Sequence, residues 1–211
     1  MIFRQFCTAD KEISYLLADP VTRQAALLDP NLLAEKNYRQ IIEQLDLTLG
    51  LVMLTRIHEL QAMQTSIWCE PTGAQLVSAR TSQWATSALQ VSDGDDVFIG
   101  EELVHVLATP GYSTCSLSFC WRDRVFTGHT LLAGATGSCQ RVDADAGDLF
   151  DSVREKLFAL PDETLVYPGR KNTERCLSSI GQERTLNEEL TPRMTRELFI
   201  QGKQHETMSH T

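Results

Sequence analysis

Residues 54–61 read Leu-Thr-Arg-Ile-His-Glu-Leu-Gln and follow directly on an apolar segment, residues 47–54. That segment is apolar almost throughout, as expected for a strand buried on both faces. The polar residues after it stand where a metal-binding loop is expected. His58 and Glu59 do not form the helical zinc motif of metalloproteases, because Ala62 stands where its second histidine would have to be.

Length and composition favour one globular domain. The 211 residues are 42% hydrophobic, enough for one sizeable core, and we assign residues 1–201 to a single domain. Residues 202–211 are polar and are expected to form a disordered tail. A net charge of -9 argues against nucleic-acid binding, which needs clustered Lys and Arg. No apolar stretch approaches the roughly 18 residues that span a bilayer, so we expect no membrane contact.

The start of the chain lacks a basic flank, a long apolar run and a small-residue cleavage site, so no secretory signal is expected. We therefore predict a cytoplasmic protein whose cysteines are reduced thiols. The cysteines are scattered without a Cys-x-x-Cys pair, which argues against a structural zinc site. They are Cys7, Cys69, Cys115, Cys120, Cys139 and Cys176.

Hydrophobic patterning predicts two β-rich halves with flanking helices. The predicted strands are residues 3–6, 13–18, 25–28, 47–54, 75–77, 87–91, 96–99, 103–108, 116–121, 124–126 and 164–167. The predicted helices are residues 32–45 with Asn31 as N-cap, 60–67, 148–160 ended by Pro161, and 191–201 with Pro192 in the first turn. This order indicates an α/β fold, an αββα sandwich of two mixed β-sheets flanked by helices.

Five further segments stand in order along the chain. They are an opening hairpin (residues 2–5, 15–20 and 26–30), residues 108–113 (Ala-Thr-Pro-Gly-Tyr-Ser), 125–132 (Val-Phe-Thr-Gly-His-Thr-Leu-Leu), 167–170 (Tyr-Pro-Gly-Arg) and 178–187 (Ser-Ser-Ile-Gly-Gln-Glu-Arg-Thr-Leu-Asn). The last four resemble Ala-Thr-Pro-Gly-His-Thr, Val-Phe-Thr-Gly-Asp-Thr-Leu-Leu, Tyr-Pro-Gly-His and Ser-Thr-Ile-Gly-Glu-Glu-Arg-x-x-Asn. These are motifs of the metallo-β-lactamase superfamily, in particular of its persulfide dioxygenase branch, with glyoxalase II as a close relative. Residues 54–61 resemble an altered copy of the superfamily's Thr-His-x-His-x-Asp-His.

The resemblance also locates the family's metal ligands in this chain. The family's first metal site corresponds to Arg56, His58 and Tyr112. Its second site corresponds to Leu60, Gln61 and Arg170, and its bridging aspartate to His129. A persulfide dioxygenase of this kind holds a single iron through three of these positions, which here are Arg56, Tyr112 and His129.

These replacements predict a site without metal. A catalytic metal needs about three protein ligands, and His58 and His129 are the conventional ligands that remain. A guanidinium offers no lone pair, so Arg56 and Arg170 are expected to bind an anion or to pair with a carboxylate such as Glu59. We expect no cofactor; the alternative is one Fe or Zn ion held weakly by His58 and His129.

Two further residues carry alternatives. Cys115 lies three residues beyond Tyr112; it is either a small buried residue or a reactive thiol with His129 as the base. Arg184 matches the closing motif, near which glutathione-linked members of the branch bind carboxylates. It is therefore either a ligand-binding residue of the pocket or a salt-bridge partner at a helix end.

The predicted function follows from the replaced metal-ligand positions and from the turns that still match the family motifs. Ligand positions changed together, while the turns at residues 110–111, 127–128 and 168–169 look intact. We therefore predict a pseudoenzyme that binds a small anionic or thiol-containing ligand, or a protein partner. The alternative is a glutathione-persulfide dioxygenase or a glyoxalase II-like thioester hydrolase on a rebuilt mononuclear site. The resemblance also makes a homodimer an expectation.

Overall fold

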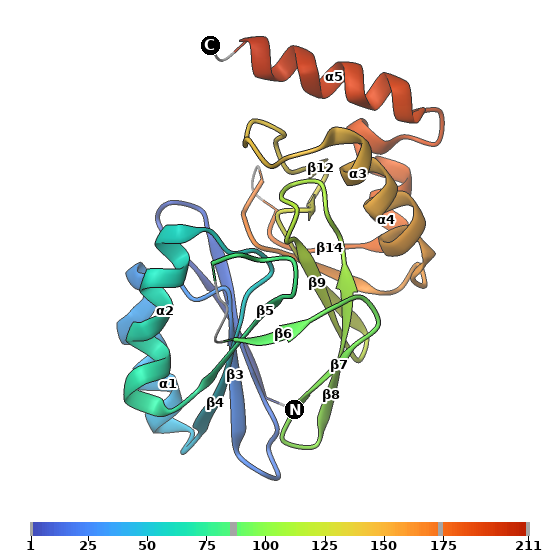
Figure 1. Cartoon of the computed structure of the whole chain (residues 1–211). Coiled ribbons are helices and arrows are strands. Elements are labelled where there is room, and N and C mark those ends of the chain that lie inside the picture. Colours follow the sequence, from blue (N-terminus) through green and yellow to red (C-terminus); the bar gives the residue numbers. More distant parts are fainter. Residues whose placement is uncertain (1, 85–87, 173–174, 210–211) are drawn as a thin grey trace.

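Two six-stranded β-sheets face each other, and the helices lie on their outer sides (Figure 1). This computed structural model describes residues 2–84, 88–172 and 175–209, without the side chains of residues 59–61 and 207–209. Both sheets contain parallel and antiparallel pairs. The αββα sandwich predicted from the sequence is confirmed.

The first sheet has the order β1-β2-β3-β4-β5-β6. Its strands are β1 (Ile2–Cys7), β2 (Ile13–Ala18), β3 (Gln24–Leu28), β4 (Thr48–Met53), β5 (Gln75–Ala79) and β6 (Leu89–Val91). The pairs from β1 to β3 are antiparallel and those from β3 to β6 are parallel. Parallel neighbours need crossover connections, and two of these are α1 (Glu35–Gln44) and α2 (Glu59–Thr72). Both helices cover the outer face of this sheet (Figure 1).

The second sheet has the order β14-β13-β10-β9-β8-β7. Its strands are β7 (Asp96–Ile99), β8 (Glu102–Ala108), β9 (Leu117–Trp121), β10 (Arg124–Gly128), β13 (Leu165–Pro168) and β14 (Ser178–Ser179). The β10–β13 pair is parallel, and the other pairs are antiparallel. A small hairpin of β11 (Leu131–Leu132) and β12 (Ala135–Thr136) lies beyond β10.

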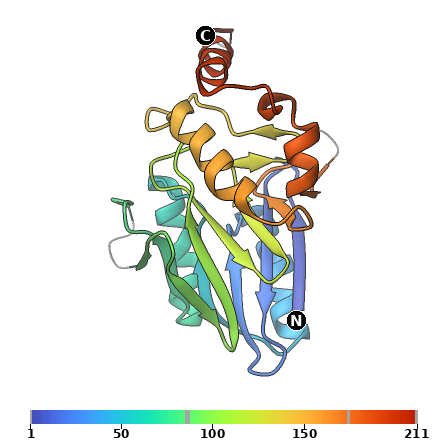
Figure 2. The same cartoon turned by 90° about the vertical axis from the view of Figure 1, so that its right-hand side faces the viewer.

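The second sheet is flanked by helices from the C-terminal third of the chain. They are α3 (Ala146–Asp151), continued by a π-helical turn Ser152–Lys156 and a 3-10 turn Leu157–Ala159, then α4 (Ile180–Leu186) and α5 (Arg196–Ser209). In Figure 2, α3 crosses in front of this sheet and α5 stands at the far end of the molecule. No helix in the described part of the chain is long and apolar enough to cross a bilayer.

Several predicted boundaries are corrected by the structure. Asn31 does cap a helix, but the first turn, Leu32–Ala34, is a 3-10 turn before α1. The helix predicted over 60–67 extends to Thr72. The terminal helix starts at Arg196 rather than residue 191 and continues to Ser209, so most of the expected tail is helical. The strand predicted over 87–91 is seen over Leu89–Val91, and Ser87 lies outside the described residues.

The core fills the space between the sheets and a second space under the C-terminal helices. Between the sheets, the rings of Phe3, Tyr15, Phe126 and Tyr167 contact one another, with centroids 4.9–6.1 Å apart. Burying each large apolar side chain contributes roughly 1.5–3 kcal/mol. The second cluster includes Leu149, Val153, Ile180 and Phe199, and it attaches α3, α4 and α5 to the sheet.

The ends of the strands bring loops of both sheets together. β4 leads into residues 54–58, β10 into His129, and β13 into Arg170. The turn between β1 and β2 reaches across to the same place: Ile13 N donates to the carbonyl of Gly169 at 2.7 Å, and Lys171 N donates to that of Lys11 at 2.8 Å. This connection places Glu12, in that turn, opposite the loops that follow β4 and β10.

Candidate ligand-binding site

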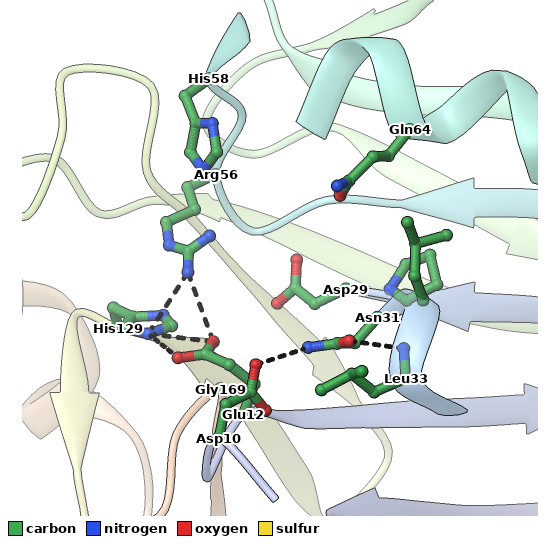
Figure 3. Close-up of a pocket in the computed structure, with 12 residues that line it drawn as sticks. Asp10, Glu12, Asp29, Asn31, Leu33, Arg56, His58, Gln64, His129 and Gly169 are labelled. Atoms are coloured by element: carbon green, nitrogen blue, oxygen red, sulfur yellow. Dashed lines mark hydrogen bonds and ion pairs between the residues drawn. The ribbon is translucent and has the colours of Figure 1, made fainter. Parts of the chain in front are cut away.

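Four charged or polar side chains converge on one point, and we call them the Glu12 cluster: Glu12, Arg56, His129 and Arg170 (Figure 3 shows the first three). Arg170 Nη1 lies 2.8 Å from Glu12 Oε1, and Arg56 Nη2 lies 3.4 Å from Oε2. His129 Nε2 is 3.3 Å from Glu12 Oε2. The loss of one partner would therefore leave charge or polar atoms unpaired.

Tyr112 packs beside this cluster rather than into it. Its ring centroid is 4.9 Å from that of His129. The guanidinium carbons of Arg56 and Arg141 lie 5.6 and 5.9 Å from the same ring. Cations at this distance from an aromatic ring are attracted to its π-electrons. Tyr112 therefore fills space beside His129 and holds two arginines.

The surroundings determine the charges of Glu12 and His129. Burial raises the pKa of Glu12, but the hydrogen bond from His129 and the charges of Arg56 and Arg170 offset this, so its pKa lies below the ordinary value. Burial, together with the positive charge of Arg56, lowers the pKa of His129 to about 4, although Glu12 opposes the shift. At neutral pH the cluster therefore holds two guanidinium cations, one carboxylate and a neutral imidazole.

Two nitrogens of the cluster lack a partner in the described part of the protein. Arg56 Nε and His129 Nδ1 are buried and make no hydrogen bond there. Buried polar atoms are normally hydrogen-bonded. His129 Nε2 lies near both a donor, Arg56 Nη2 at 3.3 Å, and the acceptor Glu12, so its role depends on the tautomer.

The loop that carries Arg56 is held in place by hydrogen bonds between Asp29 and Thr55. Asp29 accepts hydrogen bonds from Thr55 N at 2.8 Å and from Thr55 Oγ1 at 2.6 Å. Burial raises the pKa of Asp29, against the opposing effects of Arg56 and Thr55. Gly128 has φ +53°, and a Cβ there would lie 2.3 Å from Thr55 Oγ1. The kept threonine and glycine of the motifs thus support the loop independently of any metal.

Three residues of the Glu12 cluster, Glu12, Arg56 and His129, line two cavities. One, of about 400 Å³, is lined by Glu12, Arg56 and His129 together with Asn31, His58 and Gln64, and Figure 3 shows these side chains around it. The other, of about 460 Å³, is lined by the same three residues with Tyr112, Ser138 and Arg170. The predicted pocket residues Arg56, Tyr112, His129 and Arg170 therefore do come together.

His58 lies at the edge of this arrangement. It lines the 400 Å³ cavity and a neighbouring one of about 680 Å³. Burial and the charge of Arg56 lower the pKa of His58. Its ring makes no hydrogen bond or ion pair that we find within the described part of the chain, and Figure 3 shows it on the far side of Arg56 from Glu12.

Cys115 and His129 are not brought together. All six cysteines are free thiols. Cys115 is 5% exposed, and its Sγ lies 3.4 Å from the carbonyl of Ile57 and 3.5 Å from Ser113 Oγ. It lines the 680 Å³ cavity, whereas His129 faces Glu12, Arg56 and Tyr112. No contact between this thiol and the His129 imidazole is found among the described residues, and the buried Cys115 side chain is in contact with Ile57 and Ser113 instead.

Arg184 is also placed elsewhere. Its guanidinium binds the carboxylate of Asp162 and the carbonyls of Phe158 and Leu160 (3.0 Å to Leu160). It lines neither cavity of the Glu12 cluster. The prediction of Arg184 as a pocket residue is wrong, and the salt-bridge alternative describes its contacts.

The residues at the family's iron positions do not fit an iron ion. Arg56 has no lone pair to offer, and its Nη2 stands 3.3 Å from His129 Nε2, so a fixed cation adjoins the imidazole. Tyr112 contributes its ring to packing. The described residues include no group of three His, Cys, Asp or Glu side chains arranged to hold a metal. The side chains of Leu60 and Gln61, at second-site positions, lie outside the description.

Glu12 was not predicted from the sequence as a residue of the site, and a different carboxylate was expected to pair with the arginines. Glu59 was the expected partner of the arginines, and its side chain is not among those described. Glu12 lies in a hairpin turn, 44 residues before Arg56 and 158 before Arg170. An isolated antiparallel β-bridge between the backbones of Glu12 and Arg170 brings these two residues side by side. In the sequence, the one indication was that Glu12 lies within the hairpin that resembles the family's opening hairpin. That resemblance does not show which charged residues the turn would contact.

Comparisons with known proteins place the chain in a family. It is 33% identical over 181 residues to the mitochondrial persulfide dioxygenase ETHE1 of Mus musculus, covering 84% of this chain and 71% of the relative. The crystal structure of ETHE1 from Myxococcus xanthus matches with a TM-score of 0.92 and 37% identity, over 98% of this chain and 91% of that one. The chain belongs to the metallo-β-lactamase superfamily, in its persulfide dioxygenase branch.

The fold is shared more widely than this branch. A metallo-β-lactamase from Staphylococcus aureus subsp. aureus COL matches with a TM-score of 0.81 at 23% identity, over 95% of this chain and 66% of that one. At that identity the likeness shows the fold alone. No family model matches the chain.

Proposed function

We propose that this chain is a metal-independent member of the persulfide dioxygenase branch that binds a small anionic ligand, thiol-containing or not, in place of catalysis. The observation that carries the proposal is the position of Arg56, whose guanidinium stands at the family's first ligand position and lies 3.4 Å from Glu12 Oε2 and 3.3 Å from His129 Nε2. A fixed cation there disfavours a metal cation and favours an anion.

The charges and the space of the 460 Å³ cavity support an anion. Arg56 and Arg170 line it with two positive charges against the one carboxylate of Glu12. Ser138 and the neutral His129 line the same 460 Å³ cavity and supply hydrogen-bonding groups. Charge-assisted hydrogen bonds to a guanidinium are about twice as strong as neutral ones. Such a pocket suits a small carboxylate, sulfate-like or thiolate-bearing molecule.

Calorimetric titration tests this proposal. Acetate, sulfate and glutathione serve as probes, each titrated into the wild type, Arg170→Gln and the control Arg39→Gln. Arg170 is 47% exposed, so its loss should not unfold the protein, and Arg39 forms a surface pair with Glu35. One lost charge-assisted bond should weaken binding about tenfold or more. Failure of all three probes to bind the wild type, or equal binding by Arg170→Gln, contradicts the proposal.

A second candidate is a persulfide dioxygenase, or a thioester hydrolase, on a rebuilt mononuclear site. It is favoured by the names of the relatives and by the shared cavity of His58 and His129. Oxygen consumption with glutathione persulfide, and hydrolysis of S-lactoylglutathione, test it after addition of iron, zinc or manganese. We expect neither activity to exceed that of the heat-treated protein. Turnover that disappears in His129→Ala would favour the enzyme.

Interaction and location remain predictions. A protein partner or a homodimer would give the metal-free domain a role in assembly, and sedimentation of the purified protein measures the dimer directly. The cytoplasmic location predicted from the sequence is likewise a proposal, tested by fractionation of the native cells.

A further inference from the structure

The Glu12 carboxylate is bound as a small ligand would be. Arg170 Nη1 contacts its Oε1 at 2.8 Å, and Arg56 and His129 contact it at 3.3–3.4 Å. These three residues come from three different loops. The protein therefore already shows how this group of side chains accepts one carboxylate.

The same carboxylate stands between the two cavities. Glu12 lines both the 400 Å³ and the 460 Å³ cavity, as do Arg56 and His129. Its side chain is 23% exposed and that of Arg170 is 47% exposed, so both can move without disturbing the core. A rotation of Glu12 away from the arginines would leave both guanidinium groups facing the 460 Å³ cavity.

The backbone of Glu12 is held by bonds that do not involve its side chain, so the side chain can turn without moving the backbone. Thr8 N donates to the carbonyl of Glu12 at 3.0 Å, and the following amide, Ile13 N, donates to Gly169 at 2.7 Å. The isolated β-bridge with Arg170 fixes the same peptide. A carboxylate tethered in this way acts at a high effective concentration, so it competes strongly with any free anion.

We propose, on the basis of the proposed function, that Glu12 is a tethered competitor occupying the anion subsite between Arg56 and Arg170, and that a small carboxylate binds by displacing it. The subsite suits a carboxylate because it pairs one with two guanidinium groups and an imidazole. Glu12 thereby sets the ligand concentration at which the pocket fills. The apparent Kd equals the intrinsic Kd divided by the fraction of time that Glu12 leaves the subsite free.

The test is acetate titration of the wild type, Glu12→Gln and Asp10→Asn, followed by calorimetry. Asp10 is the matched control, because it lines the same 400 Å³ cavity but bonds Thr8 and Asn31 instead of the arginines. Both variants remove one negative charge near the ligand, and only Glu12→Gln frees the guanidinium groups. Thermal unfolding of each variant verifies that it is folded, and Glu12→Asp provides a second variant that keeps the charge on a shorter arm.

Displacement predicts that Glu12→Gln binds acetate about tenfold more tightly than the wild type if Glu12 fills the subsite nine-tenths of the time. Asp10→Asn should change the affinity by less than about threefold, as expected for a screened charge. The inference is overturned if both variants gain acetate affinity equally, or if Glu12→Gln binds acetate no more tightly than the wild type. In either case, binding of acetate by the wild type still supports the anion site. Absence of binding in every protein removes the anion site itself and this inference with it.

Discussion

Gly128 shows at the scale of one residue that a family motif can support the backbone without contributing a metal ligand. Its φ of +53° is a conformation that favours glycine, and Thr55 Oγ1 occupies the place of a Cβ. Thr55 in turn is bound by Asp29. The glycine, the threonine and the aspartate therefore support the backbone of the site whether or not a metal binds there.

Gly128→Ala is therefore expected to destabilise the protein. The backbone strain and the overpacking against Thr55 together should cost about 2–4 kcal/mol in the free energy of unfolding. Gly202→Ala is the control, because a Cβ there meets no atom within 4 Å and alanine favours the helix by up to about 1 kcal/mol. Urea unfolding measures both. A Gly128→Ala protein as stable as the wild type would show that this close approach is not maintained.

The sequence motifs predicted which residues occupy the family's ligand positions. Arg56, Tyr112, His129 and Arg170 come together as the motif positions indicated. The role of Glu12, which contacts Arg56, His129 and Arg170, could not be predicted, because its hairpin turn reaches the site only through tertiary contacts. Arg184 and Cys115 were misplaced for a related reason. Motif position shows which loop a residue belongs to, and not which way its side chain turns.

At the scale of elements, turns join the two sheets. Asp19, in the β2–β3 turn, accepts hydrogen bonds from Thr22 Oγ1 at 2.6 Å, Val21 N at 2.9 Å and Glu101 N at 3.0 Å. Glu101 lies in the β7–β8 turn of the other sheet. The hydrogen bonds from Thr22, Glu101 and Val21 lower the pKa of Asp19 to about 2.

This pKa predicts a specific pH dependence. Because the pKa of Asp19 is lower in the folded protein than its ordinary value of 3.8, its stabilising effect is present above about pH 4 and is lost as pH falls toward 2. Asp19→Asn should lower stability at pH 7 and make the urea midpoint less dependent on pH between 4 and 2. Parallel pH profiles for the two proteins would rule out this role.

Elements with strong patterning were predicted well. β2 and β7 have the predicted bounds, and the other predicted strands differ by one or two residues at one or both ends. The short strands β11, β12 and β14 and the helix α4 were not predicted from the patterning. They are two to seven residues long, too short to show a period, and they form because tertiary contacts supply their partners. The start of α5 was missed because Pro192 appeared to be a first-turn proline.

At the scale of the whole molecule, α5 packs into the second core cluster, so we expect it to unfold together with the rest of the domain. Phe199 is 3% exposed, packs on Phe150 with ring centroids 5.5 Å apart and belongs to the second core cluster. The neighbouring Leu198 is 53% exposed. The helix thus closes the second core on one face and meets solvent on the other.

Phe199→Ala should therefore destabilise the whole domain, by about 3–5 kcal/mol as for other buried aromatic residues. Leu198→Ala should change stability by less than about 0.5 kcal/mol. Chemical unfolding followed by circular dichroism and by tryptophan fluorescence tests both, since the three tryptophans lie before residue 122. A Phe199→Ala protein that loses only helix signal, with an unchanged fluorescence midpoint, would show that α5 unfolds separately.

We propose that this fold has been kept while its metal site was replaced by the Glu12 cluster. The test is elemental analysis of wild-type protein, purified without chelator from cells supplied with iron and zinc. The triple variant Arg56→His, Tyr112→His, His129→Asp, which restores the family's iron ligands, is the positive control. We predict well under one metal ion per wild-type chain and iron in the variant. A stoichiometric metal in the wild type that is lost in His129→Ala would contradict the claim.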